Sequence, residues 1–171
     1  MTTISKKVCL LGDFAVGKTS LIRRFVYNRF DETYLTTIGV HVSRKALTVP
    51  RDERLIDLAL MIWDLAGENG FERVRQSYLR GAAGAVLVCD LTRADTLAGV
   101  IRSAEQVLSA SPAARLVVAA NKHDLANEQQ LAPAQIEAVA GQIDAPLYLT
   151  SARTGDEVEA LFRHLGRQLV I

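Results

Sequence analysis

The residues best suited to chemistry lie near the start of the chain, in the stretch 12–20. This stretch fits the pattern G-x-x-x-x-G-K-[ST], in which backbone N–H groups wrap around phosphates, the lysine adds positive charge and the hydroxyl binds Mg²⁺. The apolar run 8–11 precedes it, and residues 18–28 have the apolar spacing of a helix whose N-terminus would face an anion. The predicted phosphate-binding residues are Asp13, Phe14, Ala15, Val16, Gly17, Lys18, Thr19 and Ser20.

An acidic residue ends a second apolar run, residues 55–63. Asp64 opens the pattern D-x-x-G, which suits a carboxylate that holds Mg²⁺ through water and a glycine, Gly67, whose N–H meets a γ-phosphate. The pattern is common by chance, so Asp64 taken alone is equally compatible with a strand-end turn.

A third pattern follows the apolar run 115–120, where Asn121, Lys122 and Asp124 stand in the order N-K-x-D. A carboxylate that accepts hydrogen bonds from both N1–H and the 2-amino group selects guanine over adenine. The lysine stem can cover one face of the base. Ser151 and Ala152 follow the last apolar run and can offer a backbone N–H to the guanine O6. For 121–124 alone, a capped turn is the alternative. Together with the phosphate loop, the N-K-x-D pattern predicts a guanine site.

Short apolar runs alternate with helical patterns, which predicts a mostly parallel sheet covered on both faces. Because ligands in such sheets sit at the carboxyl ends of the strands, the motifs should meet there. The expected strands are 6–11, 39–50, 55–63, 82–90, 115–120 and 146–150, and the expected helices are 18–28, 96–110, 132–141 and 156–170. Residues 39–63 should form an antiparallel hairpin around a polar turn at 50–54. The core side of helix 96–110 should carry Leu97, Val100, Ile101, Ala104, Val107 and Leu108.

The composition fits one domain, 1–171, with 49% hydrophobic and 23% charged residues. The formal net charge of +1 gives no reason to expect nucleic-acid binding. Cys9 and Cys89 lie in apolar runs and are predicted to be buried thiols. The polar N-terminus, the lack of an apolar run of about 18 residues and a C-terminus without cysteine predict a cytoplasmic chain with no direct lipid anchor.

Taken together, the motifs resemble those of a small GTPase of the Ras superfamily, and within it the Rab branch. The resemblance rests on 12–20, 34–39, 63–67, 78–81, 121–124 and 151–152, in the family's order. It implies a P-loop NTPase G domain with a six-stranded, mostly parallel sheet, one antiparallel edge strand and about five helices. The implied ligands are GTP, GDP and Mg²⁺, and the implied activity is hydrolysis of GTP to GDP.

The same resemblance assigns roles to further residues. Switch I would span about 29–39 and switch II about 65–80, both ordering around the γ-phosphate and binding an effector, an exchange factor and a GTPase-activating protein. Thr37 would join Thr19 and Asp64 at Mg²⁺, and Phe30 would lie against guanine, although a helix-end core position is its alternative. The implied nucleotide contacts also include Tyr34, Gly67, Ser151, Ala152 and Arg153, and the implied catalytic residues are Lys18, Gly67 and Glu68.

Two residues depart from the family pattern at the phosphate end. Glu68 stands where most members have the glutamine that orients the attacking water. An ionised glutamate only accepts hydrogen bonds and adds negative charge beside the γ-phosphate, so slow hydrolysis is expected. The alternatives are that Glu68 acts as a base, is protonated, or faces solvent. Phe14 occupies a place where small residues are usual and would crowd an arginine supplied by a partner. Arginines at 29, 73 and 75 are expected to be solvated rather than to act in its place.

Other departures concern the surface. The turn at 50–54 is a few residues longer than usual, which is expected to be a plain turn rather than a partner surface. The chain stops after its last helix, without a prenylated tail, which suits a monomeric bacterial Rab-like protein. A nucleotide-bound scaffold with negligible hydrolysis remains open because of Glu68 and Phe14. A P-loop ATPase or kinase is disfavoured by 121–124.

Overall fold

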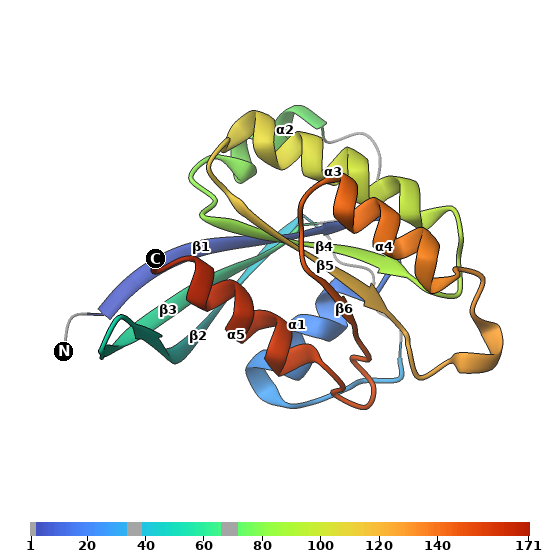
Figure 1. Ribbon diagram of the computed structural model, residues 1–171, viewed down its shortest axis with the longest axis horizontal. Coiled ribbons are helices and arrows are strands. Elements are labelled where there is room, and N and C mark those ends of the chain that lie inside the picture. Colours follow the sequence, from blue (N-terminus) through green and yellow to red (C-terminus); the bar gives the residue numbers. More distant parts are fainter. Residues whose placement is uncertain (1–2, 34–38, 66–71) are drawn as a thin grey trace.

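One six-stranded sheet, with strand order β2-β3-β1-β4-β5-β6, forms the centre of the computed structural model (Figure 1). The structure describes residues 3–33, 39–65 and 72–171. Only the β2–β3 pair is antiparallel among the pairings described, because the two strands form a hairpin. The strands are β1 Thr3–Gly12, β2 Val40–Arg51, β3 Arg54–Leu65, β4 Gly84–Asp90, β5 Arg115–Asn121 and β6 Leu147–Leu149. The predicted fold class is confirmed.

Helices cover both faces of the sheet (Figure 1). Helices α1 and α5 pack on one face, and α2, α3 and α4 lie on the other. Their bounds are α1 Lys18–Tyr27, α2 Glu72–Leu79, α3 Thr96–Ala110, α4 Pro133–Gln142 and α5 Val158–Gln168, with a short 3₁₀ helix η1 at Ala126–Glu128. All seven residues of β4 are buried, as expected for a strand between two helical layers.

Each face of the sheet has its own apolar core. The Phe25 ring of α1 stacks on Phe162 of α5, with ring centroids 4.1 Å apart. On the opposite face, Val100, Ala104 and Val107 of α3 belong to the second core, where α3 packs mainly on β4 and β1. These two cores hold the carboxyl ends of β1, β3 and β5, where the predicted motifs lie, in fixed relative positions.

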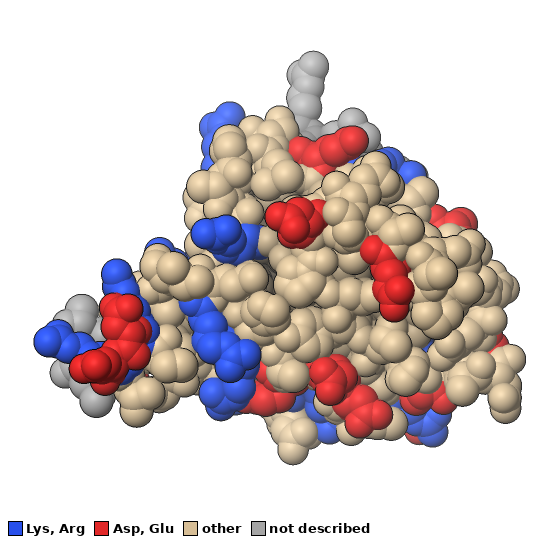
Figure 2. All heavy atoms as spheres, viewed as in Figure 1, with Lys and Arg blue, Asp and Glu red and all other residues tan. Residues whose placement is uncertain are grey.

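The hairpin and helix α3 correct two sequence predictions. Pro50 lies in β2, as the strand predicted at 39–50 implies, and an edge strand tolerates it; the turn predicted at 50–54 is instead confined to Asp52 and Glu53, because Arg51 and Arg54 pair in the hairpin. Asp52 has a φ of 53°, which a tight turn requires and aspartate tolerates. Charged side chains of both signs crowd this end of the molecule (Figure 2). Leu108 is 37% exposed, since it lies at the margin of the buried stripe of α3.

Most other predicted bounds are within a few residues of those observed, and those of α3 agree fully. Helix α2 was not predicted, because its sequence, ERVRQSYL, has a weak apolar period. Cys9 and Cys89 are buried free thiols, as predicted, and burial raises their pKa values to about 11 and about 12. None of the helices that the structure describes combines the length and the hydrophobicity that a membrane span requires.

Replacing Phe162 with alanine should lower the free energy of unfolding by about 3–5 kcal/mol, because it removes a buried ring stacked on Phe25 and leaves a cavity. Urea unfolding of the variant and of the wild-type protein, each with saturating GDP, would measure this difference in the free energy of unfolding. Leu55→Ala is the control, since Leu55 is 62% exposed and its loss should cost about 0.5 kcal/mol or less. Equal unfolding midpoints for the two variants would contradict this account of the core.

Candidate functional site

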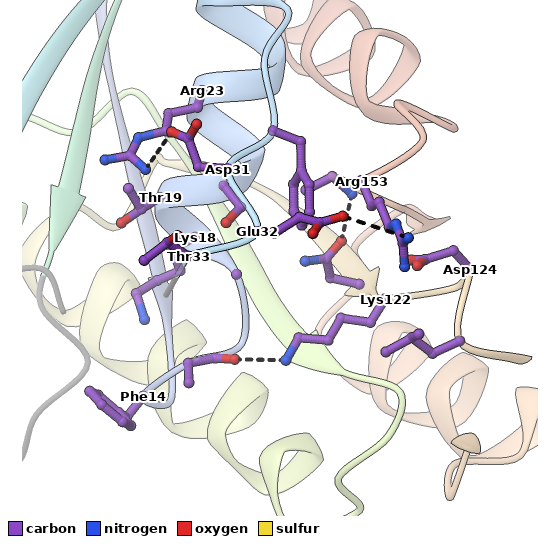
Figure 3. Close-up of a pocket in the computed structure, with 17 residues that line it drawn as sticks. Phe14, Lys18, Thr19, Arg23, Asp31, Glu32, Thr33, Lys122, Asp124 and Arg153 are labelled. Carbon is purple, nitrogen blue, oxygen red and sulfur yellow. Dashed lines mark hydrogen bonds and ion pairs between the residues drawn. The ribbon is translucent and has the colours of Figure 1, made fainter. Parts of the chain in front are cut away.

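A cavity of about 480 Å³ opens where the phosphate loop, the end of β5 and the loop after β6 meet (Figure 3). Lys18 and Thr19 lie at one end, and Asp124 and Arg153 lie at the other. The predicted binding residues that line it are Phe14, Ala15, Gly17, Lys18, Thr19, Ser20, Phe30, Asn121, Lys122, Asp124, Ala152 and Arg153. The motifs that are far apart in the sequence therefore converge on one hollow.

Glycine is required at two positions of the phosphate loop. A Cβ on Gly12 would lie 2.4 Å from the carbonyl oxygen of Val88, and a Cβ on Gly17 would lie 2.3 Å from Asn121 Nδ2. Gly17 also has a φ of 104°, which side chains rarely allow. The loop can pass between β4 and the Asn121 side chain only because both positions lack side chains.

Lys18 is held inside the loop rather than pointing to solvent. Its Nζ donates to the carbonyl oxygens of Gly12, at 2.9 Å, and Asp13, at 3.0 Å. Burial lowers the pKa of Lys18 to about 8, an effect that Asp64 opposes and the charge of Arg75 reinforces. Arg75, predicted to be solvated, is half-buried. A phosphate would add negative charge beside this buried ammonium and favour its charged form.

Thr19 and Asp64 form a pair that fits Mg²⁺. The Thr19 hydroxyl donates to Asp64 Oδ2 at 2.5 Å, and the carboxylate is 2% exposed. Burial raises the pKa of Asp64, and the Thr19 hydrogen bond and Lys18 oppose the rise. Among the described residues, Asp64 Oδ1 has no hydrogen-bond partner although it is buried. A hydroxyl beside a buried, unsatisfied carboxylate oxygen is the donor set that a hard cation prefers.

The opposite end of the cavity has the polar groups expected for a base. Asp124 is exposed to the cavity side, and Ser151 fixes it by donating its hydroxyl to Oδ1 at 2.8 Å. The Ala152 N–H, predicted to reach guanine, donates to Asn121 Oδ1 at 3.3 Å. Phe30 lines the cavity and also packs against the core, which is compatible with either of its two predicted roles.

Asn121 and Lys122 bind the phosphate loop itself. Asn121 Nδ2 donates to the carbonyl oxygen of Val16 at 3.0 Å, and Lys122 Nζ donates to that of Ala15 at 3.0 Å. Lys122 has a φ of 67°, which turns its side chain back towards the loop. Four predicted residues, Tyr34, Thr37, Gly67 and Glu68, lie outside the described residues.

Sequence reasoning missed one arginine at the base end. Arg24 of α1 donates from Nε to the carbonyl oxygen of Ala152 at 2.8 Å, and from Nη2 to that of Arg153. It also donates from Nη1 to Asn28 Oδ1 at 3.1 Å. One side chain thus joins the loop after β6 to the end of α1, which leads to Phe30. No spacing rule signals a contact between residues 128 positions apart.

Comparison with known proteins decides the class. The model of the Ras family matches residues 7–171. The chain belongs to the Ras family. It is 35% identical over 171 residues to "GTP-binding protein ypt5" of Schizosaccharomyces pombe. That alignment covers 99% of this chain and 80% of the relative. It is also 35% identical over 164 residues to the human "Ras-related protein Rab-31", with 95% and 82% covered.

The match makes this chain a Rab-like small GTPase of the Ras superfamily. Ras-family members are GTP-binding switches and GTPases, they bind guanine nucleotides, typically with Mg²⁺, and they act through effectors, exchange factors and GTPase-activating proteins. The geometry described above fits this class, since phosphate, cation and base groups occur in one cavity. The P-loop kinase alternative is excluded by the family.

In this small GTPase, Arg24→Gln should release bound GDP about tenfold faster, because the two charged-donor hydrogen bonds that hold the loop after β6 are lost. Dissociation of a fluorescent GDP would measure the rate. Arg163→Gln is the matched control, because Arg163 pairs only with Glu159 on the surface of α5 among the described contacts. If Arg24→Gln and Arg163→Gln released GDP equally fast, Arg24 would have no role in holding the base.

Proposed function

We propose that this chain is a slow, self-contained GTP switch: it binds GTP or GDP with Mg²⁺, hydrolyses GTP at a low intrinsic rate, and signals through residues of about 29–39 and 65–80. The observation that supports it best is one cavity lined by Lys18, Thr19 and Asp124, with Asp64 hydrogen-bonded to Thr19 behind it. Only a ligand with phosphates at one end and a polar base at the other uses all three.

The protein groups have distinct roles in this proposal. The amides of 13–17 and the Lys18 ammonium bind phosphate oxygens, and Thr19, Asp64 and Thr37 hold the cation, with Asp64 acting through water. Bound Mg²⁺ supplies charge neutralisation on the phosphates. Asp124 accepts from the base, Asn121 and Lys122 hold the loop against it, and Ala152 and Phe30 complete the base site.

Hydrolysis requires a water placed in line with the bond to be broken. By the family pattern, Glu68 stands in the sequence where a glutamine would orient that water, and as a carboxylate it accepts a hydrogen bond without donating one. In that role its negative charge would add to that of the γ-phosphate, so the transition state would gain less stabilisation. A scaffold that binds GTP without hydrolysing it is the second candidate function, and the glutamate at position 68 favours it as well.

Phe14 bears on regulation by partners. The ring is 42% exposed and projects away from the other labelled side chains of the cavity (Figure 3). A partner that inserted an arginine next to the phosphates would have to displace this ring. We therefore propose that hydrolysis is not stimulated in that manner.

Base selectivity tests nucleotide binding. Unlabelled GTP should displace fluorescent GDP, and ATP should be weaker by about 10⁴-fold, because adenine leaves Asp124 without a donor pair. Asp124→Asn should weaken guanine binding and improve xanthine binding, since an amide can donate to the 2-oxo group. Asp144→Asn, in a remote turn with a φ of 51°, is the control and should bind as wild type does. Equal displacement by ATP and GTP would refute the guanine site.

Single-turnover hydrolysis tests the role of Glu68. Protein loaded with GTP and Mg²⁺ should convert it to GDP over hours, and Glu68→Gln should be several-fold faster because a glutamine can donate to the water and carries no charge. Glu159→Gln, which makes the same charge change on α5, should leave the rate unaltered. A Glu68→Gln rate no higher than that of wild type would show that Glu68 does not limit hydrolysis.

A further inference from the structure

The phosphate loop has a feature that no nucleotide contact accounts for: each of its five carbonyl groups from residue 12 to residue 16 accepts a hydrogen bond from a side chain. Lys18 binds the first two, and Lys122 and Asn121 bind the last two. The middle one, on Phe14, accepts from Arg93 Nη2 at 2.6 Å. Arg93 lies in the turn between β4 and α3, 79 residues away.

A planar trans peptide directs its C=O and its N–H in opposite directions. A side chain that holds the carbonyl of residue 14 on the protein side therefore turns the N–H of residue 15 to the other side, where Ala15 lines the cavity. The same reasoning applies to every plane of the loop. Arg93 is the member of this set that fixes the plane between Phe14 and Ala15.

The peptide plane between Phe14 and Ala15 depends more than its neighbours on hydrogen bonds from outside the loop. Ala15 has a φ of 60°, in the left-handed region that costs a residue with a Cβ about 1 kcal/mol or more. Arg93 binds the carbonyl before Ala15, and Lys122 binds the carbonyl of Ala15 itself. The two cations clamp the strained residue from both sides.

A buried carboxylate joins the two cations. Asp90 is fully buried, and its Oδ2 accepts from Lys122 Nζ at 2.7 Å and from Arg93 Nε at 3.1 Å. Burial acts to raise the pKa of Asp90, but hydrogen bonds from Lys122 and Thr92 outweigh it, so the pKa lies below its usual value. Asp90 therefore carries a fixed negative charge. It joins Arg93 to Lys122, which also borders the proposed base site.

The backbone of Arg93 is fixed as well. Its N–H donates to the Asp90 carbonyl at 3.0 Å, and its own carbonyl accepts from the Thr96 hydroxyl at 2.8 Å. Helix α3 then runs close under the loop, where a Cβ on Gly99 would lie 2.6 Å from Asp13 Oδ1. Arg93 is thus pre-positioned before any ligand arrives, and its hydrogen bond costs little further ordering.

We propose that Arg93 is a positioning residue for nucleotide binding: through the Phe14 carbonyl it aims the Ala15 N–H at the phosphates and so slows nucleotide release. The proposal rests on the guanine-nucleotide function proposed above. Arg93 is held by Asp90 on one side and Phe14 on the other, so it acts in the ground state rather than as a mobile catalytic arginine.

Release of fluorescent GDP from the Mg²⁺-loaded protein tests this role. Arg93→Ala should release GDP about tenfold faster or more, which is the effect of losing a charged-donor hydrogen bond. Arg93→Lys should also be faster than wild type, because one ammonium cannot bridge Asp90 and the Phe14 carbonyl as the guanidinium fork does. Arg102→Ala is the control: Arg102 lies on α3 and meets the loop only through the Asp13 side chain, at 3.5 Å, among the described contacts.

The ³¹P spectrum of bound GDP gives a readout that a general loss of stability would not produce. The β-phosphate resonance should move in Arg93→Ala and Arg93→Lys, and should stay in place in Arg102→Ala. Three results would each overturn the role of Arg93: release from Arg93→Ala within twofold of wild type, wild-type release and spectrum in Arg93→Lys, or equal acceleration in Arg102→Ala. If wild-type protein failed to retain GDP at all, the proposed function itself would be refuted.

Discussion

The side-chain amide of Asn121 is the contact on which the site depends most. Its Nδ2 donates to the carbonyl of Val16, and its Oδ1 accepts from the hydroxyl of Thr150 and the N–H of Ala152. The amide is 2% exposed, so each of these hydrogen bonds is costly to lose. It joins the phosphate half and the base half of the cavity into one rigid unit, and the absence of a side chain at Gly17 is what admits it.

Much of the fold could be predicted because its elements carry local signals. Strand β4 is a continuous apolar run, and α3 has a clear helical period between Thr96 and Ala110. Where the period is weak, as in α2, or where charged residues continue a hairpin to its turn, as at Arg51 and Arg54, the local pattern does not determine the element. The exposure of Leu108 depends on what packs beside α3, which no single segment encodes.

The site divides in the same way. Lys18, Thr19, Asp64, Asn121 and Asp124 follow the ends of strands in recognisable patterns, so sequence alone brings them together. Arg24 and Arg93 do not, because an arginine that donates to a backbone carbonyl leaves no trace in the identity of the residue that accepts. Both are flexible side chains whose partners lie across the fold, and only coordinates show which carbonyls they reach.

The close approach of α3 to the phosphate loop has a consequence for control from a distance. The Asp13 carboxylate lies against Gly99 of α3, and Arg93 lies in the turn that leads into the same helix. A displacement of α3 by a fraction of an ångström must therefore be taken up by the loop, since packed atoms cannot interpenetrate. A molecule that binds the outer surface of α3 is therefore expected to disturb the phosphate loop without contacting residues 29–39 or 65–80.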